Sequence, residues 1–456
     1  MEDNHDIIIV GCGLSGLSAA HFLKKKLPEA KVLILEGSER PGGAIQTFKK
    51  SGFQAEWGPH GFLNNNQASQ ELLADTGLIK EALSAPLKNF HRYVCFDGRL
   101  VKLPQGPVKL LSTPLLSVGG KLRLLGDLWK KPKTEDQTIG QWAEYRFGRE
   151  VLPMVDVAVT GTFAGDLNRL SIDAVMPGVR QLEKEAGSVL RGLKKNKKEA
   201  ASSGGLPSML NFPQGMERLI EVLCRDRNIR FGEPVNKIAK NGDLWEVKTE
   251  KGQYAARILI LALPVNNSLH LLSYLKPPPV AGIPGAKIIN LAMGFNDSAK
   301  IPYGFGYLAP EREKRFALGA MFTSHMFPGR APDGQVLVEA LVGGRRHPER
   351  LALPDDELAR LVYEDMSGLM ELPEKPSFVR VLRSAESIPQ LEMDHPALVK
   401  WRHDFEKEQS GIHICGFGWD GIGMNDMMKA AQKVALAAAT GSGEDSEVVP
   451  VKPVYF

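Results

Sequence analysis

The sequence predicts an α/β fold in which a doubly wound, Rossmann-like dinucleotide-binding domain adjoins a mixed-sheet domain and carries an inserted helical lobe. Three observations lead to this fold class. A β-branched run near the start of the chain passes directly into a glycine-rich turn and an apolar helix, which is the pattern of a βαβ nucleotide-binding unit. The chain has 456 residues, 43% of them hydrophobic, which is enough for two or three domains. A long, basic segment of mostly helical sequence separates strand-rich parts.

The first βαβ unit carries the motif GxGxxG. The expected first strand, IIIV, precedes the motif, and the second strand, VLIL, ends at Glu36. Gly11 permits a tight turn, Gly13 lets the backbone approach a pyrophosphate, and Gly16 lets the helix pack on the strand. The N-terminus of the helix attracts phosphates, and the carboxylate of Glu36 can accept hydrogen bonds from ribose hydroxyls. We therefore expect a dinucleotide site here.

Two further glycine turns follow this unit. An Arg-x-Gly-Gly turn runs from Arg40 to Gly43, and a Gly-Pro pair lies within the segment 56–61. These turns favour backbone that wraps a cofactor longer than NAD. Ordinary surface turns are the alternative, since glycine and proline occur in loops everywhere.

The C-terminal part contains one more strand and one more helix. Residues 411–416 form an apolar strand that ends in glycine, and an alanine- and methionine-rich helix extends from Met424 to about residue 439. A plain terminal helix that packs on the domain is the alternative to a cofactor-facing helix.

The pattern E-x-x-x-R-x-G-G after a dinucleotide fingerprint resembles the flavin amine oxidase superfamily, whose members bind FAD. In that superfamily the C-terminal strand returns to the first sheet, and the helix N-terminus points at the flavin. Cys415 lies inside the strand and is no counterpart of the cysteine that bonds flavin in monoamine oxidases, so we expect non-covalent FAD. The resemblance implies cofactor contacts by Gly11, Cys12, Gly13, Leu14, Ser15, Gly16, Glu36, Gly37, Arg40, Gly43, Ala44, Gly58, Pro59, His60, Gly61, Val235, Gly416, Ile422, Gly423, Met424 and Asn425.

Further segments, spread over nearly the whole chain, are similar to the oxygen-dependent protoporphyrinogen oxidase family. The chain departs from the family pattern at His60 and at Leu391, where members commonly have other residues, and this affects the expected shape of the pocket. The similar segments are GTFAGD at 161–166 with the Leu-Ser pair at 170–171, the strand–turn–strand at 93–104, FPQGM at 212–216, IPQ at 388–390 and GMND at 423–426.

The family resemblance implies an FAD-dependent, six-electron oxidation of protoporphyrinogen IX to protoporphyrin IX with O2 as acceptor and H2O2 as product. A hydride would pass from a methylene bridge to flavin N5, so no catalytic side chain is expected. Arg92 is the expected partner of a substrate propionate, and Gly165 and Phe305 are expected at the substrate. The alternatives are an exposed arginine at 92 and a core aromatic at 305.

Other functions remain open from the sequence. A coproporphyrinogen III oxidase of the same family would act on a substrate with four carboxylates. An amine oxidase or a carotenoid desaturase is a more distant enzyme, and a non-catalytic FAD-binding scaffold belongs to another class of protein.

The expected domain plan places an FAD-binding domain in three separate stretches of chain. The segment 88–200 contains 20 basic and 12 acidic residues, a net charge of +8 in a chain whose total is +4. Such a lobe suits an anionic ligand or an anionic membrane. The expected boundaries are 1–87, 206–275 and 401–456 for the FAD-binding domain, 88–205 for the helical, basic lobe and 276–400 for the substrate-binding domain, with a mobile linker at 194–205.

The apolar and basic stretch 110–133 suggests peripheral contact with a membrane, although a buried helix with a basic rim is the alternative. We expect no targeting peptide and a location in the cytoplasm or at the cytoplasmic face of the cell membrane. The small net charge argues against nucleic acid, and the cysteines and histidines lack metal-site spacing. The expected partners are a porphyrinogen, O2 and a ferrochelatase, and the sequence does not indicate the oligomeric state.

Overall fold

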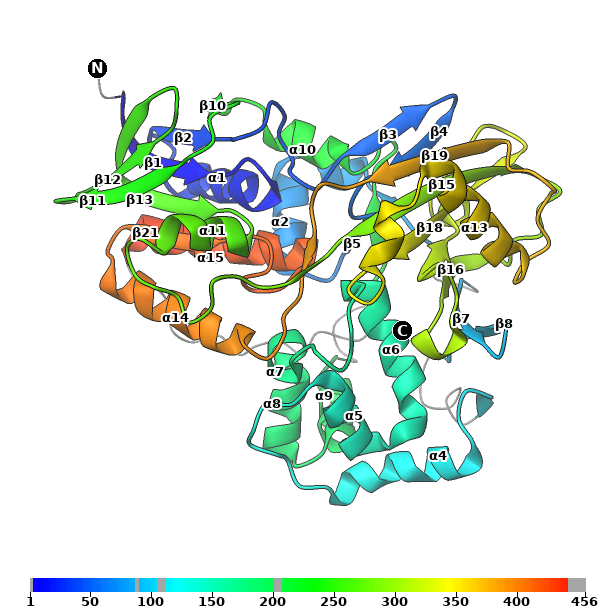
Figure 1. Ribbon diagram of the computed structural model, residues 1–456. Helices are drawn as coiled ribbons and strands as arrows, with labels where there is room; N and C mark the ends of the chain where they lie inside the picture. Colours follow the sequence, from blue (N-terminus) through cyan, green and yellow to red (C-terminus); the bar gives the residue numbers. More distant parts are fainter. Residues whose placement is uncertain (1–2, 87–89, 105–111, 201–206, 442–456) are drawn as a thin grey trace.

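A computed structural model describes residues 3–86, 90–104, 112–200 and 207–441. Two sheets lie side by side in the upper part of Figure 1, and a group of helices lies below them. The fold class expected from the sequence is confirmed. None of the described helices is long and apolar enough to cross a bilayer.

The first sheet has seven strands and is parallel in its centre. Its order is β10-β2-β1-β13-β12-β11, and β21 pairs with the far part of β13. The strands β10, β2, β1, β13 and β21 are parallel, and β11 and β12 are antiparallel to their neighbours. The bounds are β1 Asp3–Val10, β2 Val32–Leu35, β10 Ile229–Arg230, β11 Lys237–Asn241, β12 Leu244–Lys248, β13 Gln253–Ala262 and β21 Ile412–Cys415.

Helices cover both faces of this sheet, because alternate residues of the apolar run in β1 point to opposite sides. Ile7 and Ile9 pack in one core with α1 (Leu14–Lys26) and α15 (Met424–Thr440). Ile8 and Val10 pack in another with α11 (Val265–Leu272) and α14 (His395–Glu408). The result is a doubly wound domain built from distant parts of the chain (Figure 1).

The second sheet is mixed and has the strand order β19-β15-β18-β17-β16-β7-β8. All neighbours are antiparallel except β7 and β16. Helix α13 (Asp355–Ser367) packs against it. Because β7 and β8 belong here by pairing, the boundary expected at residue 88 divides this sheet, and the helical lobe begins later. The bounds are β7 His91–Phe96, β8 Arg99–Lys102, β15 Ile288–Asn296, β16 Gly304–Leu308, β17 Gly319–Met321, β18 Gln335–Gly343 and β19 Phe378–Arg383.

The inserted lobe is helical and encloses charged groups. Arg146 is fully buried and forms ion pairs with Asp127 and Glu183. Helix α9 continues to residue 200, so the linker expected from 194 starts as helix, and 201–205 lie outside the described residues. The helices are α4 Val118–Leu124, α5 Ile139–Phe147, α6 Leu152–Phe163, α7 Ile172–Val175, α8 Pro177–Ala186 and α9 Val189–Ala200.

Short elements connect the three parts. They are the hairpin of β3 (Thr47–Lys50) and β4 (Phe53–Glu56), the small sheet of β5 (Phe62–Leu63), β9 (Met209–Asn211) and β6 (Leu83–Ser84), the pair β14 (Gly285–Ala286) and β20 (Ile388–Pro389), and helices α2 (Gln67–Asp75), α10 (Glu217–Leu223) and α12 (Thr323–Met326).

Candidate functional site

The glycine-rich turn lies at the carboxyl end of β1 and opens helix α1. Gly11 has φ +103°, and a Cβ there would lie 2.8 Å from the carbonyl oxygen of Ala262. A Cβ on Gly16 would overlap the carbonyl oxygen of Gly11. These two glycines are therefore required by the local fold. Gly13 differs, because no atom lies within 4 Å of its Cβ position.

Glu36 and the Arg-x-Gly-Gly turn hold this loop from the side of β2. The backbone N–H of Cys12 donates to Glu36 Oε2 at 2.7 Å, and Ser38 donates to Oε1 from its N–H and hydroxyl. The guanidinium of Arg40 donates to the carbonyl oxygen of Gly43 at 2.7 Å. Gly43 approaches Gly13, since its Cβ position lies 3.8 Å from the Gly13 Cα.

The residues around Gly13 fit the diphosphate of a dinucleotide. Helix α1 has no side-chain cap and no acidic residue in its first turn, so its N-terminal N–H groups face the open space. The buried hydroxyl of Ser15 has no hydrogen-bond partner among the described residues. Leu14 and Cys12 are buried below the loop. Gly37 contacts Pro234, which places Val235 close to the Glu36 side of the loop.

The C-terminal turn meets the first loop at the same edge of the sheet. A Cβ on Gly416 would overlap the carbonyl oxygen of Leu263, the residue that follows the Ala262 contacted by Gly11. Helix α15 begins at Gly423, whose N–H donates to Asp426 Oδ2 at 3.1 Å. The side chain of Asn425 donates to the Leu63 carbonyl oxygen at 2.9 Å, and its own oxygen is buried without a partner among the described residues.

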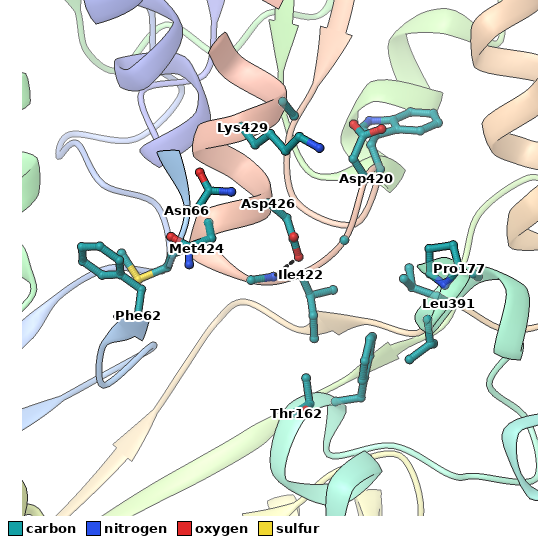
Figure 2. Close-up of a pocket in the computed structure, with 18 of the residues that line it drawn as sticks. Phe62, Asn66, Thr162, Pro177, Leu391, Asp420, Ile422, Met424, Asp426 and Lys429 are labelled. Carbon is teal, nitrogen blue, oxygen red and sulfur yellow. Dashed lines mark hydrogen bonds between the residues drawn. The ribbon is translucent and has the colours of Figure 1, made fainter. Parts of the chain in front are cut away.

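A cavity of about 2040 Å³ extends from this turn towards α6 and the second sheet. Figure 2 shows Ile422 near the centre of the view, with Phe62 on one side and Leu391 and Pro177 on the other. Gly61, Gly423, Met424 and Asn425 also belong to the wall, whereas the loop 11–16 does not. The structure therefore separates a loop suited to phosphates from a large, mostly apolar cavity.

Arg92 lies in this cavity wall, on β7. Its guanidinium stacks over the ring of Phe305, 4.9 Å from the ring centroid. Burial lowers the pKa of Arg92 below its ordinary value, and no carboxylate among the described residues pairs with it. A half-buried cation without an anionic partner suits an anionic ligand. Two of the three residues expected at the substrate, Arg92 and Phe305, are thus brought together.

Gly165 is placed differently. It does not belong to the described cavity wall, and a Cβ there would lie 2.8 Å from Gln390 Oε1 and 2.9 Å from Leu170. Its place is in the packing behind the wall, whereas the nearby Gly161 and Thr162 line the cavity. Contact between Gly165 and the substrate stays a prediction.

The turn that contains Gly58, Pro59 and His60 is tied to the second sheet by a buried polar cluster. A Cβ on Gly58 would overlap the carbonyl oxygen of Ala44. His60 Nε2 lies 2.9 Å from Glu339 Oε2, on β18. Asn290, on β15, donates to Glu339 and to the carbonyl oxygen of Glu56. Glu339 and Asn290 were not predicted from the sequence, although a glutamate inside the apolar strand QVLVEALVG was a signal.

Charge stabilises this cluster. Burial alone would raise the pKa of Glu339, but the charge and hydrogen bond of His60 bring it below its ordinary value. Burial alone would lower the pKa of His60, but Glu339 raises it above its ordinary value. Burial raises the pKa of Glu56, opposed by Arg330, whose Nη1 lies 3.6 Å away.

Comparison with known proteins agrees with this geometry. The family model for flavin-containing amine oxidoreductases matches residues 14–436. A coproporphyrinogen III oxidase of Bacillus subtilis is 28% identical, over 94% of this chain and 97% of that protein. A mitochondrial protoporphyrinogen oxidase of Nicotiana tabacum is 25% identical, over 95% of each chain. A solved structure from Exiguobacterium sp. 255-15 superposes with a TM-score of 0.80 at 20% identity, covering 96% of this chain and 99% of that one.

A doubly wound domain with an open phosphate loop and a separate, mostly apolar cavity is typical of a dinucleotide-dependent oxidoreductase. The chain belongs to the flavin-containing amine oxidoreductase family, which confirms the resemblance seen in the sequence. It is an FAD-dependent oxidoreductase, and FAD supplies the two-electron acceptor when bound.

Substitutions at Gly13 and Gly16, two of the glycines in the phosphate loop, should distinguish an effect on FAD binding from an effect on folding. Gly13→Ala fills open space, so we expect normal thermal unfolding of the apoprotein but at least about tenfold weaker FAD binding, since the added methyl occupies the place of the diphosphate. In Gly16→Ala, the matched control, the added methyl overlaps the Gly11 carbonyl oxygen, so this substitution should lower the unfolding temperature of the apoprotein. Fluorescence titration with FAD and thermal melts measure both. Unchanged FAD affinity in Gly13→Ala would show that the cofactor lies elsewhere.

Proposed function

We propose that the protein catalyses the six-electron oxidation of protoporphyrinogen IX to protoporphyrin IX, with O2 as the final acceptor and H2O2 as product. The observation that carries this proposal is the half-buried Arg92 guanidinium, which stacks on Phe305 in a mostly apolar cavity without a carboxylate partner among the described residues. An apolar macrocycle with carboxylates along one edge matches this arrangement. The names of the relatives in Bacillus subtilis and Nicotiana tabacum support a porphyrinogen as substrate.

The proposed division of work follows the architecture. The first sheet and its helices hold FAD, the second sheet presents Arg92 and Phe305, and the lobe α4–α9 closes the cavity from below. Arg92 orients the macrocycle through a propionate, and the apolar wall that includes Leu308 and Leu391 excludes water. No side chain is needed as a general base in this scheme. A ferrochelatase is the enzyme that we expect to receive the product.

Coproporphyrinogen III is the second candidate substrate, and one observation favours it. The far end of the cavity wall, at α14 and α15, carries Arg402, Lys407, Lys429 and Lys433. These cations could serve additional carboxylates, although Arg402 already forms two hydrogen bonds with Asp420, at 2.7 and 2.8 Å. The relative in Bacillus subtilis bears the name of this activity.

The test compares the two porphyrinogens under air with the purified, FAD-loaded protein. Porphyrin fluorescence and H2O2 release are measured together, and we expect a higher kcat/KM for protoporphyrinogen IX. A higher value for coproporphyrinogen III would overturn our choice of substrate. Fluorescence that rises no faster than in a protein-free control, with both substrates, would favour the non-catalytic FAD-binding scaffold.

Arg92→Ala should raise KM for the porphyrinogen about 10- to 100-fold, because a charge-assisted hydrogen bond contributes about 1.5–3 kcal/mol. FAD should remain bound, since Arg92 lies on the second sheet. Arg99→Ala, which removes an exposed arginine from the adjacent β8, is the matched control and should behave as the unaltered protein. Equal KM values in both variants would remove Arg92 from the substrate site.

We also propose that the lobe binds an anionic membrane surface through α4 and the 3₁₀ turn Leu125–Trp129. Large apolar side chains are exposed there: Val118 by 75%, Leu122 by 64% and Trp129 by 77%. Lys121 and Lys130 accompany them. Exposed apolar groups among cations are typical of interfacial helices. Leu110 and Leu111, which open the expected stretch, lie outside the described residues.

The double substitution Leu122→Ser with Trp129→Ser should weaken binding to vesicles that contain phosphatidylserine by at least about tenfold, because it removes most of the inserted apolar surface. Tyr274→Ser is the matched control, since Tyr274 is 78% exposed but lies just after α11, in the doubly wound domain. Flotation with vesicles measures the bound fraction. Equal binding of the double variant and the control would contradict a membrane contact at this face.

A further inference from the structure

We propose that His60 and Glu339 form a charged pair that places a positive imidazolium beside the bound flavin and favours its reduced form. In this role His60 and Glu339 are positioning residues. The inference rests on the FAD contacts that the family resemblance implies for residues 58–61, and it does not depend on which substrate reduces the flavin.

The pair joins the second sheet to the turn 56–60 at one carboxylate oxygen. Glu339 Oε2 lies 2.9 Å from His60 Nε2 and accepts the backbone N–H of Glu56 at 3.3 Å. The amide of Asn290 donates to the same oxygen. A single carboxylate of the second sheet therefore holds both ends of the turn that begins at Glu56 and ends at His60.

Two of the connecting strands, β9 and β3, hold the same turn. The amide of Asn211, on β9, donates to the His60 carbonyl oxygen at 2.8 Å and to Glu56 Oε1 at 3.2 Å. Thr47, on β3, donates to Glu56 Oε2 at 2.7 Å. The position of the turn is thus set by the second sheet and by these connecting strands together.

The turn lies between the loop that carries Ala44 and the cavity. Gly58 packs against the carbonyl oxygen of Ala44, just after the Arg-x-Gly-Gly turn, and Gly61 lines the cavity. The His60 side chain keeps 11% exposure, whereas Glu339 keeps 1%. With Nε2 committed to Glu339, the remaining ring nitrogen Nδ1 has no hydrogen-bond partner among the described residues. It can donate a further hydrogen bond when the ring is protonated.

Four groups from four parts of the chain face the imidazole. Glu339 comes from β18, Glu56 from β4, Arg330 from the turn before β18, and Asn290 from β15. Glu339 and Glu56 raise the pKa of His60, whereas burial and Arg330 lower it, and the net direction is upward. The imidazolium is therefore present below this raised pKa and is lost as pH rises through it. A positive group near flavin stabilises the additional negative charge of the reduced form.

The experiment measures the midpoint potential of the FAD-loaded protein by dye-equilibrated chemical reduction, over a range of about pH 6 to pH 10. In His60→Gln, at the acid end, we expect about tenfold weaker binding of reduced relative to oxidised FAD, which corresponds to a potential about 30 mV more negative for two electrons. This difference should fade as pH rises, because the unaltered protein then loses its imidazolium. In Glu339→Gln, the pKa of His60 should fall, because the charge of Glu339 no longer opposes the effect of burial. The midpoint potential should therefore change at a lower pH than in the unaltered protein.

Asp365→Asn is the matched control, because it also converts a buried carboxylate of the second domain to an amide. Asp365 pairs with Arg315 at 3.1 Å. The midpoint potential of the Asp365→Asn variant should equal that of the unaltered protein at every pH. A His60→Gln difference that is zero, or constant with pH, would overturn the proposal. If His60→Gln does not hold FAD, an identical pH profile in Glu339→Gln and the unaltered protein would overturn it. Porphyrinogen is absent from this measurement, so its result is independent of the substrate assignment.

Discussion

The parallel pairing of β1, β13 and β21 is the constraint on which the rest of the site depends. Val10 pairs with Leu261, and Ala262 pairs with Cys415, so three distant stretches of chain end at one edge of the sheet. Because the carboxyl ends of parallel strands meet there, the Gly11 turn and the Gly416 turn lie on either side of residues 262–263. Helices α1 and α15 start from these turns, and their N-termini provide positive dipole ends for anionic parts of the cofactor.

The second constraint is the buried contact between the second sheet and the turn 56–60. Glu339 reaches from β18 to the turn at His60, and Asn290 reaches from β15 to the carbonyl oxygen of Glu56. A carboxylate at this depth is stable only because several donors and a cation surround it. The cluster therefore couples the position of the turn 56–60, where we expect the cofactor, to the sheet that presents Arg92. Binding and redox properties can influence each other through this contact.

The sequence was sufficient to predict the parts that depend on local pattern. The turn 11–16, its helix and Glu36 form a contiguous motif whose geometry follows from glycine conformation. Similarity to a family supplied Arg92 and Phe305, which do meet in the cavity. The long-range parts could not be predicted in this way. Residues 91–102 join a sheet whose other strands begin almost 200 residues later, because parallel pairing with β16 carries no local signal.

Other long-range contacts were not predicted for the same kind of reason. Gly165 packs close to Gln390, and this contact depends on how the segment at β20 lies behind α6. Glu339 stands in an apolar strand, and its partners come from three other segments of the chain. The charge of the lobe is also partly internal, as the burial of Arg146 with Asp127 shows. The buried charged side chains among the described residues of the lobe are two basic and three acidic, so their burial leaves the net positive charge on its surface: Arg146, Arg180, Asp127, Asp156 and Glu183.

We propose that a porphyrinogen delivers electrons to the FAD that the protein binds. Anaerobic mixing of the FAD-loaded protein with protoporphyrinogen IX tests it most directly. We predict that the yellow absorbance of oxidised flavin is lost at a rate that rises with substrate concentration and returns on admission of O2. Flavin that stays oxidised with both protoporphyrinogen IX and coproporphyrinogen III would contradict the account.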